Sequence, residues 1–293
     1  MIAILFFALI LEANASAQKS VRGSQTTISL GLVSEINQKE IENHFRPFAD
    51  YVGRRLSYDT ARVLIAPTAL QLAKLLEEKK VDFYMESPYP TYVINKQGAA
   101  VLLLRRWKNG MAEYHSLIIT KNGGKISALK DLRGNLIAFE DPGSTSGYFL
   151  PKVFLLNKRF KLTERSRPGA QVAANEIGYI FAGSDRKVVD SVISQQTAAG
   201  AISDDDYSHL DGKQRAEITI LAQTEPFPRH LVSTRKDLDP MVKDRLKEVL
   251  LSMNQDNEGR KILQQTDNTT KFDLLPGGEE MVRRKLQELF RPR

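Results

Sequence analysis

The stretch Asp141–Gly147, which reads Asp-Pro-Gly-Ser-Thr-Ser-Gly, contains the residue types best suited to chemistry. It follows an apolar run, Leu136–Phe139, that predicts a buried strand, and its Pro-Gly pair predicts a turn. A helix is then expected to begin. The first N–H groups of a helix have no partner within it, and the helix dipole is positive there. The pattern therefore predicts an anion site, with further donors from the hydroxyls of Ser144, Thr145 and Ser146.

Two other interpretations of this stretch stay open. Ser and Thr are ordinary N-cap residues, so a capped helix without a ligand is one alternative. If a ligand does bind, Gly147 would leave space beside it; in a simple capped helix it would only be a small residue. A hydrolase is the other, but the centre of Gly143–Gly147 is Thr145, where a nucleophile elbow has Ser. The four histidines show no metal-ligand spacing. We therefore expect a binding protein without catalytic activity, metal or cofactor.

Further polar residues follow other predicted strands. Ser34 follows the strand Thr26–Val33, and Glu86 and Ser87 follow the strand at residues 81–85. Ser87-Pro88 predicts an N-cap with proline at the first helical position, which brings Tyr89 into the same region. In open α/β sheets ligands bind at the carboxyl ends of the strands. Ligand contacts are therefore expected from Ser34, Glu86, Ser87 and Tyr89.

These residues are carried by alternating strands and helices. Residues 26–33, 62–65, 81–85 and 100–104 read as strands, and the residues between them carry helical apolar stripes. This alternation predicts α/β architecture with open, mainly parallel sheets. Residues 115–224 form a second α/β unit inside the first, which would consist of residues 26–114 and 225–293. Two lobes joined by two strands would close on a ligand by hinge motion.

Composition and the amino terminus narrow the function class. The chain has 293 residues, no cysteine and a formal net charge of +7. Its basic residues are dispersed, so no nucleic-acid partner is expected. Residues 1–17 combine an apolar run with Ala15-Ser16-Ala17, which predicts a signal peptide cleaved after Ala17 and a periplasmic location. No Lys or Arg precedes the apolar run. Two alternatives therefore stay open: the true start codon lies upstream of Met1, or the segment is an uncleaved anchor.

Several strings resemble one family in order along the chain. They are Ala49-Asp50-Tyr51-Val52, Ser87-Pro88-Tyr89, Leu129–Gly134, Asp141–Gly147, Phe181–Ser184 and Asp256–Arg260. The sequence thereby resembles the phosphate/phosphite/phosphonate-type solute-binding proteins of ABC importers, over about residues 28–263. The resemblance implies the type II periplasmic binding protein fold: two open α/β sheets joined by two hinge strands. It also implies an oxyanion bound by the hydroxyls and amides of Ser144–Ser146.

Three acidic positions depart from that family's pattern. After Phe181–Ser184 the family usually has His, whereas this chain has Asp185, and Glu86 stands where family members often have Tyr, Leu or Gly. An acid near residues 203–206 can hold a ligand amine in the family, and Asp205 is the central candidate here. Glu86 and Asp185 would repel a dianion. We therefore expect a small oxyanion or zwitterion, phosphonate-like, whose cationic end meets Glu86, Asp185 or Asp205.

The resemblance implies a protein that delivers this ligand to an ABC permease. The alternative is a sensor that presents it to a membrane histidine kinase or cyclase, because the same fold serves both. A monomer is expected. Arg229 and His230 fall near the predicted hinge, where we expect a structural role.

Overall fold

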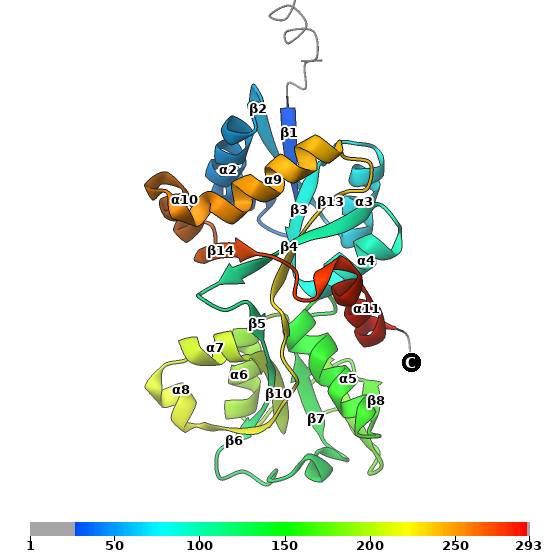
Figure 1. Ribbon diagram of the computed structural model, residues 1–293. Helices are drawn as coiled ribbons and strands as arrows, with labels where there is room; N and C mark the ends of the chain where they lie inside the picture. The colour runs from blue at the N-terminus through cyan, green and yellow to red at the C-terminus, as the bar shows by residue number, and fades with distance from the viewer. Residues whose placement is uncertain (1–26, 292–293) are drawn as a thin grey trace, which may run out of the picture.

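The computed structural model describes residues 27–291, which form two lobes stacked one above the other (Figure 1). The expected signal peptide, residues 1–17, lies outside the described residues. The α/β architecture and the two-lobed type II periplasmic binding protein fold expected from the sequence are confirmed.

Lobe 1 contains a mixed sheet of order β14-β4-β13-β3-β1-β2 among the described residues. Its strands are β1 Thr27–Val33, β2 Thr60–Ala66, β3 Phe83–Glu86, β4 Ala100–Lys108, β13 His230–Arg235 and β14 Thr269–Asp273. The strands β1, β2 and β3 are parallel, and β13 pairs antiparallel with both β3 and β4. A strand from the end of the chain thus lies between two strands from its beginning.

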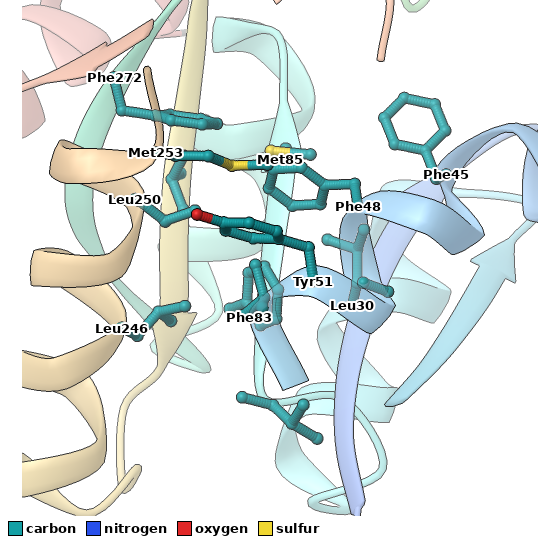
Figure 2. Close-up of a cluster of buried hydrophobic side chains, with 14 of the residues drawn as sticks. Leu30, Phe45, Phe48, Tyr51, Phe83, Met85, Leu246, Leu250, Met253 and Phe272 are labelled. Carbon is teal, nitrogen blue, oxygen red and sulfur yellow. The ribbon is translucent and has the colours of Figure 1, made fainter. Parts of the chain in front are cut away.

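Helices cover both faces of this sheet (Figure 1). One face carries α2 Gln38–Arg55, α9 Pro240–Ser252, the short helix η3 Met253–Gln255 and α10 Asn257–Gln265. The other carries α3 Ala69–Glu77, α4 Pro88–Lys96 and α11 Gly278–Phe290. Figure 2 shows the core under α2 and α9, in which Phe48 and Tyr51 of α2 meet Leu250 and Met253. The burial of these large side chains holds α2 and α9 to the sheet.

Lobe 2 contains a second sheet, of order β11-β6-β10-β7-β9-β8 among the described residues. Its strands are β6 Ser116–Lys121, β7 Leu136–Phe139, β8 Lys161–Glu164, β9 Glu176–Phe181, β10 Ala199–Ser203 and β11 Ile218–Gln223. Its helical segments are η1 Leu129–Leu132, η2 Thr145–Phe149, α5 Leu150–Asn157, α6 Asp185–Ile193, α7 Asp204–His209 and α8 Gly212–Ala216. Side chains of η2 and α5 bury one face of the sheet, and those of α6 bury the other.

The two crossings between the lobes pair with each other. They are β5, Glu113–Tyr114, and β12, Phe227–Pro228, which form an antiparallel two-stranded ladder. Beside it, the Thr224 N–H donates to Ser116 O at 3.0 Å, and the Ser116 N–H donates to Thr224 Oγ1 at 2.9 Å. The polypeptide therefore enters and leaves lobe 2 at neighbouring points, which is the geometry of a hinge.

Candidate functional site

The site lies where the two sheets present the carboxyl ends of their parallel strands to each other. In lobe 1 the chain leaves from the end of β4 and returns at the start of β13, so the ends of β1 and β3 share the edge that faces lobe 2. In lobe 2 the ends of β7, β9 and β10 lie at the edge where β6 begins. Every ligand residue expected from the sequence follows a strand at one of these two edges.

The Ser-Thr-Ser stretch begins a helix, although the first turn is π-helical. Ser144 is the N-cap of η2, and its Oγ accepts the Gly147 N–H at 2.9 Å. The same hydroxyl donates to Glu140 Oε2 at 2.6 Å. The Ser144 side chain is thus engaged within its own turn. The amides of Thr145 and Ser146 are the N–H groups that a helix start leaves for a ligand.

Thr145 connects the two lobes. Its buried Oγ1 accepts the Tyr89 N–H at 3.0 Å and donates to Ser87 Oγ at 3.2 Å. Ser87 is the N-cap of α4, as its position in the sequence predicts, but its hydroxyl meets lobe 2 instead of capping its own helix. The turns at residues 87–89 and 144–146 therefore lie in direct contact.

Tyr114 of the hinge reaches the same turn. Burial raises the pKa of its phenol, while hydrogen bonds with Thr145 and Ser146 lower it. The Tyr89 ring stacks on Phe149 of η2 with 3.6 Å between ring centroids, and both rings contact Phe290 of α11. Aromatic packing between the lobes therefore occupies the Tyr89 ring.

Gly147 lies directly against Glu140. A Cβ at this position would lie 2.5 Å from Glu140 Cβ and 2.6 Å from Glu140 Oε2. The missing side chain therefore makes room for Glu140. Glu140 itself was not among the expected residues, although it follows β7 directly, as Glu86 ends β3. Burial raises the pKa of its carboxyl to about 7, against the hydrogen bond from Ser144.

Glu86, at the end of β3, is half-buried and engaged by a backbone amide. Its Oε1 accepts the Val33 N–H at 2.5 Å, which ties the ends of β1 and β3 together. Burial raises the pKa of this carboxyl to about 8, against the hydrogen bonds from the Val33 and Ser87 amides. The raised pKa favours the protonated carboxyl near neutral pH, which would weaken the expected repulsion between Glu86 and a dianion.

The remaining expected residues lie at the same edges in different surroundings. Asp205 is buried and forms an ion pair with Arg229, and it accepts the Asn109 side-chain N–H at 2.9 Å. Asp185 is half-buried at the first position of α6. Ser34 donates its hydroxyl to Ile36 O at 2.6 Å within a turn. Asp205 is therefore already neutralised by a cation that the sequence did not link to it.

Basic residues line the lobe 1 side of this junction, and these were not predicted. Arg106 of β4 is buried and donates to Thr269 Oγ1 at 2.7 Å and to Thr266 O at 2.9 Å, beside Asp267. Burial lowers the pKa of Lys108, two residues further along β4. Burial, together with the charges of Arg106, Lys108 and Arg229, lowers the pKa of His230 well below 6.5.

Arg229 is linked to the Ser-Thr-Ser turn through Tyr114. Its guanidinium lies 5.6 Å from the centre of the Tyr114 ring, whose hydroxyl contacts the turn. One terminal nitrogen bonds Asp205, while Nε and Nη1 are buried and have no hydrogen-bond partner among the described residues. Buried donors without partners cost stability unless a ligand satisfies them. The sequence placed Arg229 near the hinge but gave no sign of these free donors.

Residues 27–291 contain neither a metal-ligating cluster nor a membrane-spanning helix. No group of three or more His, Cys, Asp or Glu side chains is arranged to hold a metal ion there. No helix in that range is long and apolar enough to cross a membrane.

The sequence matches a known protein family over most of its length. The family model described as the periplasmic substrate-binding protein of phosphonate ABC transporters matches residues 30–275.

Solved structures show the same fold. XAC2383 from Xanthomonas citri, bound to chloride ion, is 28% identical with a TM-score of 0.82, over 90% of this chain and 96% of that one. The same protein bound to ATP gives 28% identity and a TM-score of 0.81 over the same shares. PhnD1 from Prochlorococcus marinus, in complex with methylphosphonate, is 15% identical with a TM-score of 0.66, over 91% and 97% of the two chains.

Proposed function

This chain belongs to the family of periplasmic substrate-binding proteins of phosphonate ABC transporters, and from that premise we propose that it captures a small phosphonate-like oxyanion or zwitterion in the periplasm and delivers it to an ABC importer. The observation that carries this proposal is the contact between the turns at residues 87–89 and 144–146. It places the free amides of a helix start at the junction of two lobes that share one hinge.

We infer that the anionic group lies against the Thr145 and Ser146 amides, with Arg229 as its counter-charge. The buried Nε and Nη1 of Arg229 provide two donors, and charge-assisted hydrogen bonds of this kind are about twice as strong as neutral ones. A cationic ligand end would meet Asp185 or Glu140 at the lobe 2 edge. The burial of Glu86 makes that residue a poor partner for a cation.

The ligands bound to the X. citri relative widen the set of anions to test. Chloride and ATP are both anionic, and this supports an anion site in a protein 28% identical to this one. A screen by thermal shift would include phosphate, phosphite, alkyl- and aminoalkylphosphonates, sulfonates, amino acids and ATP. A ligand stabilises the folded state by RT ln(1 + [L]/Kd), so micromolar binders raise the melting temperature measurably at millimolar concentration.

The site assignment is tested with Ser144→Ala combined with Ser146→Ala. If both hydroxyls bond a charged group, affinity for the best ligand falls by several kcal/mol in isothermal titration calorimetry. Unfolding of the unliganded variant controls for loss of the Ser144 N-cap. Unchanged affinity would show that neither hydroxyl bonds the ligand. Arg229→Lys, which keeps the charge but loses Nε and Nη1, is expected to weaken binding without abolishing it.

A further inference from the structure

A hollow of about 540 Å³ in lobe 1 is lined by Glu86, Arg106 and His230 of the junction described above but by none of Ser144–Ser146. It lies at the edge of the sheet that faces lobe 2, between the ends of β1 and β3, the start of β13 and the first half of α2. Among its lining residues is His230, the direct neighbour of Arg229 in the chain. One lining residue of the hollow is therefore adjacent in the chain to Arg229, the proposed counter-charge of the ligand.

The walls of this hollow are largely apolar. Leu32, Val33, Ile41, Phe45 and Met85 line it. Ile36, at its rim, is 70% exposed, which is unusual for a large apolar side chain at the edge of a binding cleft. Apolar side chains at the rim and in the walls favour a ligand group that gains free energy by leaving water.

Most charged groups of the hollow have a partner, while Glu40, which also lines it, is exposed to solvent. Arg106 is paired with Asp267, and the His44 ring nitrogen lies 3.1 Å from the same carboxylate. Glu86 is held by the Val33 amide. The Nδ1 atom of His230 is buried and has no hydrogen-bond partner among the residues described. An uncharged group that offers one hydrogen bond matches the buried part of this lining, whereas a second anion does not.

We propose that the hollow binds an uncharged, ring-sized organic group of the same ligand whose anionic group lies at Ser144–Ser146. The proposal rests on the function proposed above and makes it more specific: the substrate class is a phosphonate or phosphate that carries a ring. A methyl or aminoethyl substituent would leave most of the hollow filled with water, while a ring would cover Ile41, Phe45 and Met85.

The first test compares two ligands with the same anionic group. Calorimetry with methylphosphonate and phenylphosphonate on the full mature chain isolates the contribution of the ring. Burying an aromatic ring is worth about 1.5–3 kcal/mol, which corresponds to roughly ten- to hundredfold tighter binding. We expect phenylphosphonate to bind at least about tenfold more tightly than methylphosphonate. Equal affinities would overturn the assignment of the hollow and leave the anion site standing.

The second test fills the hollow. Ile41 is partly buried in its wall, so Ile41→Trp should remove the preference for phenylphosphonate and leave the affinity for methylphosphonate unchanged. Leu70→Trp is the matched control, because Leu70 is 58% exposed on α3, away from the hollow. Ile41→Phe adds less volume at the same point and serves if the Trp variant does not fold.

The outcomes separate the two proposals. An equal loss of affinity for both phosphonates in Ile41→Trp and Ile41→Phe would refute a separate organic subsite. If neither phosphonate nor inorganic phosphate binds the wild-type protein, the proposed function itself fails, and the assignment of the hollow fails with it.

Discussion

Two half-buried carboxyl groups near the site have raised pKa values. The pKa of Glu86 rises to about 8 and that of Glu140 to about 7, with burial as the largest cause in each case. The sequence alone predicted that Glu86 ends a strand, but it does not distinguish a charged carboxylate from a neutral carboxylic acid. Protonation depends on how completely later segments cover the residue, and that depends on tertiary packing.

The Glu86 proton makes stability depend on pH in a defined direction. The unfolded chain loses this proton above about pH 4.5, while the folded chain keeps it up to about pH 8, so the folded state binds more protons in between. The free energy of unfolding therefore falls as pH rises through this window, by up to about 1.4 kcal/mol per pH unit. In Glu86→Gln the fall should be smaller, as measured by urea unfolding from pH 5 to 8. Glu77→Gln, at the end of α3, is the control, and identical slopes in wild type and Glu86→Gln would contradict the assignment.

The Asp205–Arg229 pair predicts a large loss of stability when one charge is removed. The two side chains are only 7% and 8% exposed. Removing one partner leaves the other charge buried without compensation, which costs about 3–5 kcal/mol. Asp205→Asn, which can still accept one hydrogen bond, should lower the free energy of unfolding by about 3 kcal/mol in urea titrations. Asp190→Asn on the exposed side of α6 should change it little, and equal effects of the two variants would refute this account.

Residues such as Arg106 show why part of the site was not predictable. Its partners Thr266, Asp267 and Thr269 lie about 160 residues further along the chain. No local pattern links them. By contrast, Ser144–Ser146 combine a strand, a turn and a helix start within a dozen residues, so the position of this turn could be predicted from local signals alone.

At the scale of elements, the regular alternation of strands and helices was visible in the sequence, whereas two of the edge strands were not. The strands β8 and β14 were missed because each lies at the edge of its sheet and reads Lys-Leu-Thr-Glu or Thr-Thr-Lys-Phe-Asp. An edge strand with an exposed face carries few apolar residues, so it lacks a strong strand signal. The central strands are nearly continuous apolar runs and were placed correctly.

The helix start at η2 predicts a sharp contrast between two glycines. A Cβ at Gly147 would meet Glu140 at 2.5 Å, whereas a Cβ at Gly212 of α8 has no atom within 4 Å. Overpacking of this kind typically costs about 1–3 kcal/mol. Gly147→Ala should therefore lower the melting temperature and weaken ligand binding, while Gly212→Ala should leave both near wild type. Differential scanning calorimetry of the two variants decides the matter; similar melting temperatures would show that the turn tolerates the added methyl.

At the scale of the whole molecule, side chains from both lobes hold the lobes together. The Tyr89–Phe149 stack joins α4 of lobe 1 to η2 of lobe 2. Such an aromatic pair contributes about 0.5–1.5 kcal/mol beyond its buried area. Phe149→Ala should therefore shift the population toward an open form and lower the apparent affinity by up to about tenfold. Small-angle X-ray scattering should show a larger radius of gyration than in Phe154→Ala, whose ring lies within lobe 2. A radius equal to that of the control would contradict the prediction.

The position of β13 has a consequence for the order in which the protein acquires its structure during synthesis. The strands β3 and β4 do not touch each other in the sheet, because β13 lies between them, and β13 is made only after all of lobe 2. A nascent chain ending near residue 224 contains every strand of the second sheet but leaves β3 and β4 with open edges. Lobe 2 can therefore fold before lobe 1 is complete. In unfinished chains the open edges of β3 and β4, which β13 later joins, are the expected points of aggregation. The sheet of lobe 1 is thus completed only as the last seventy residues are made.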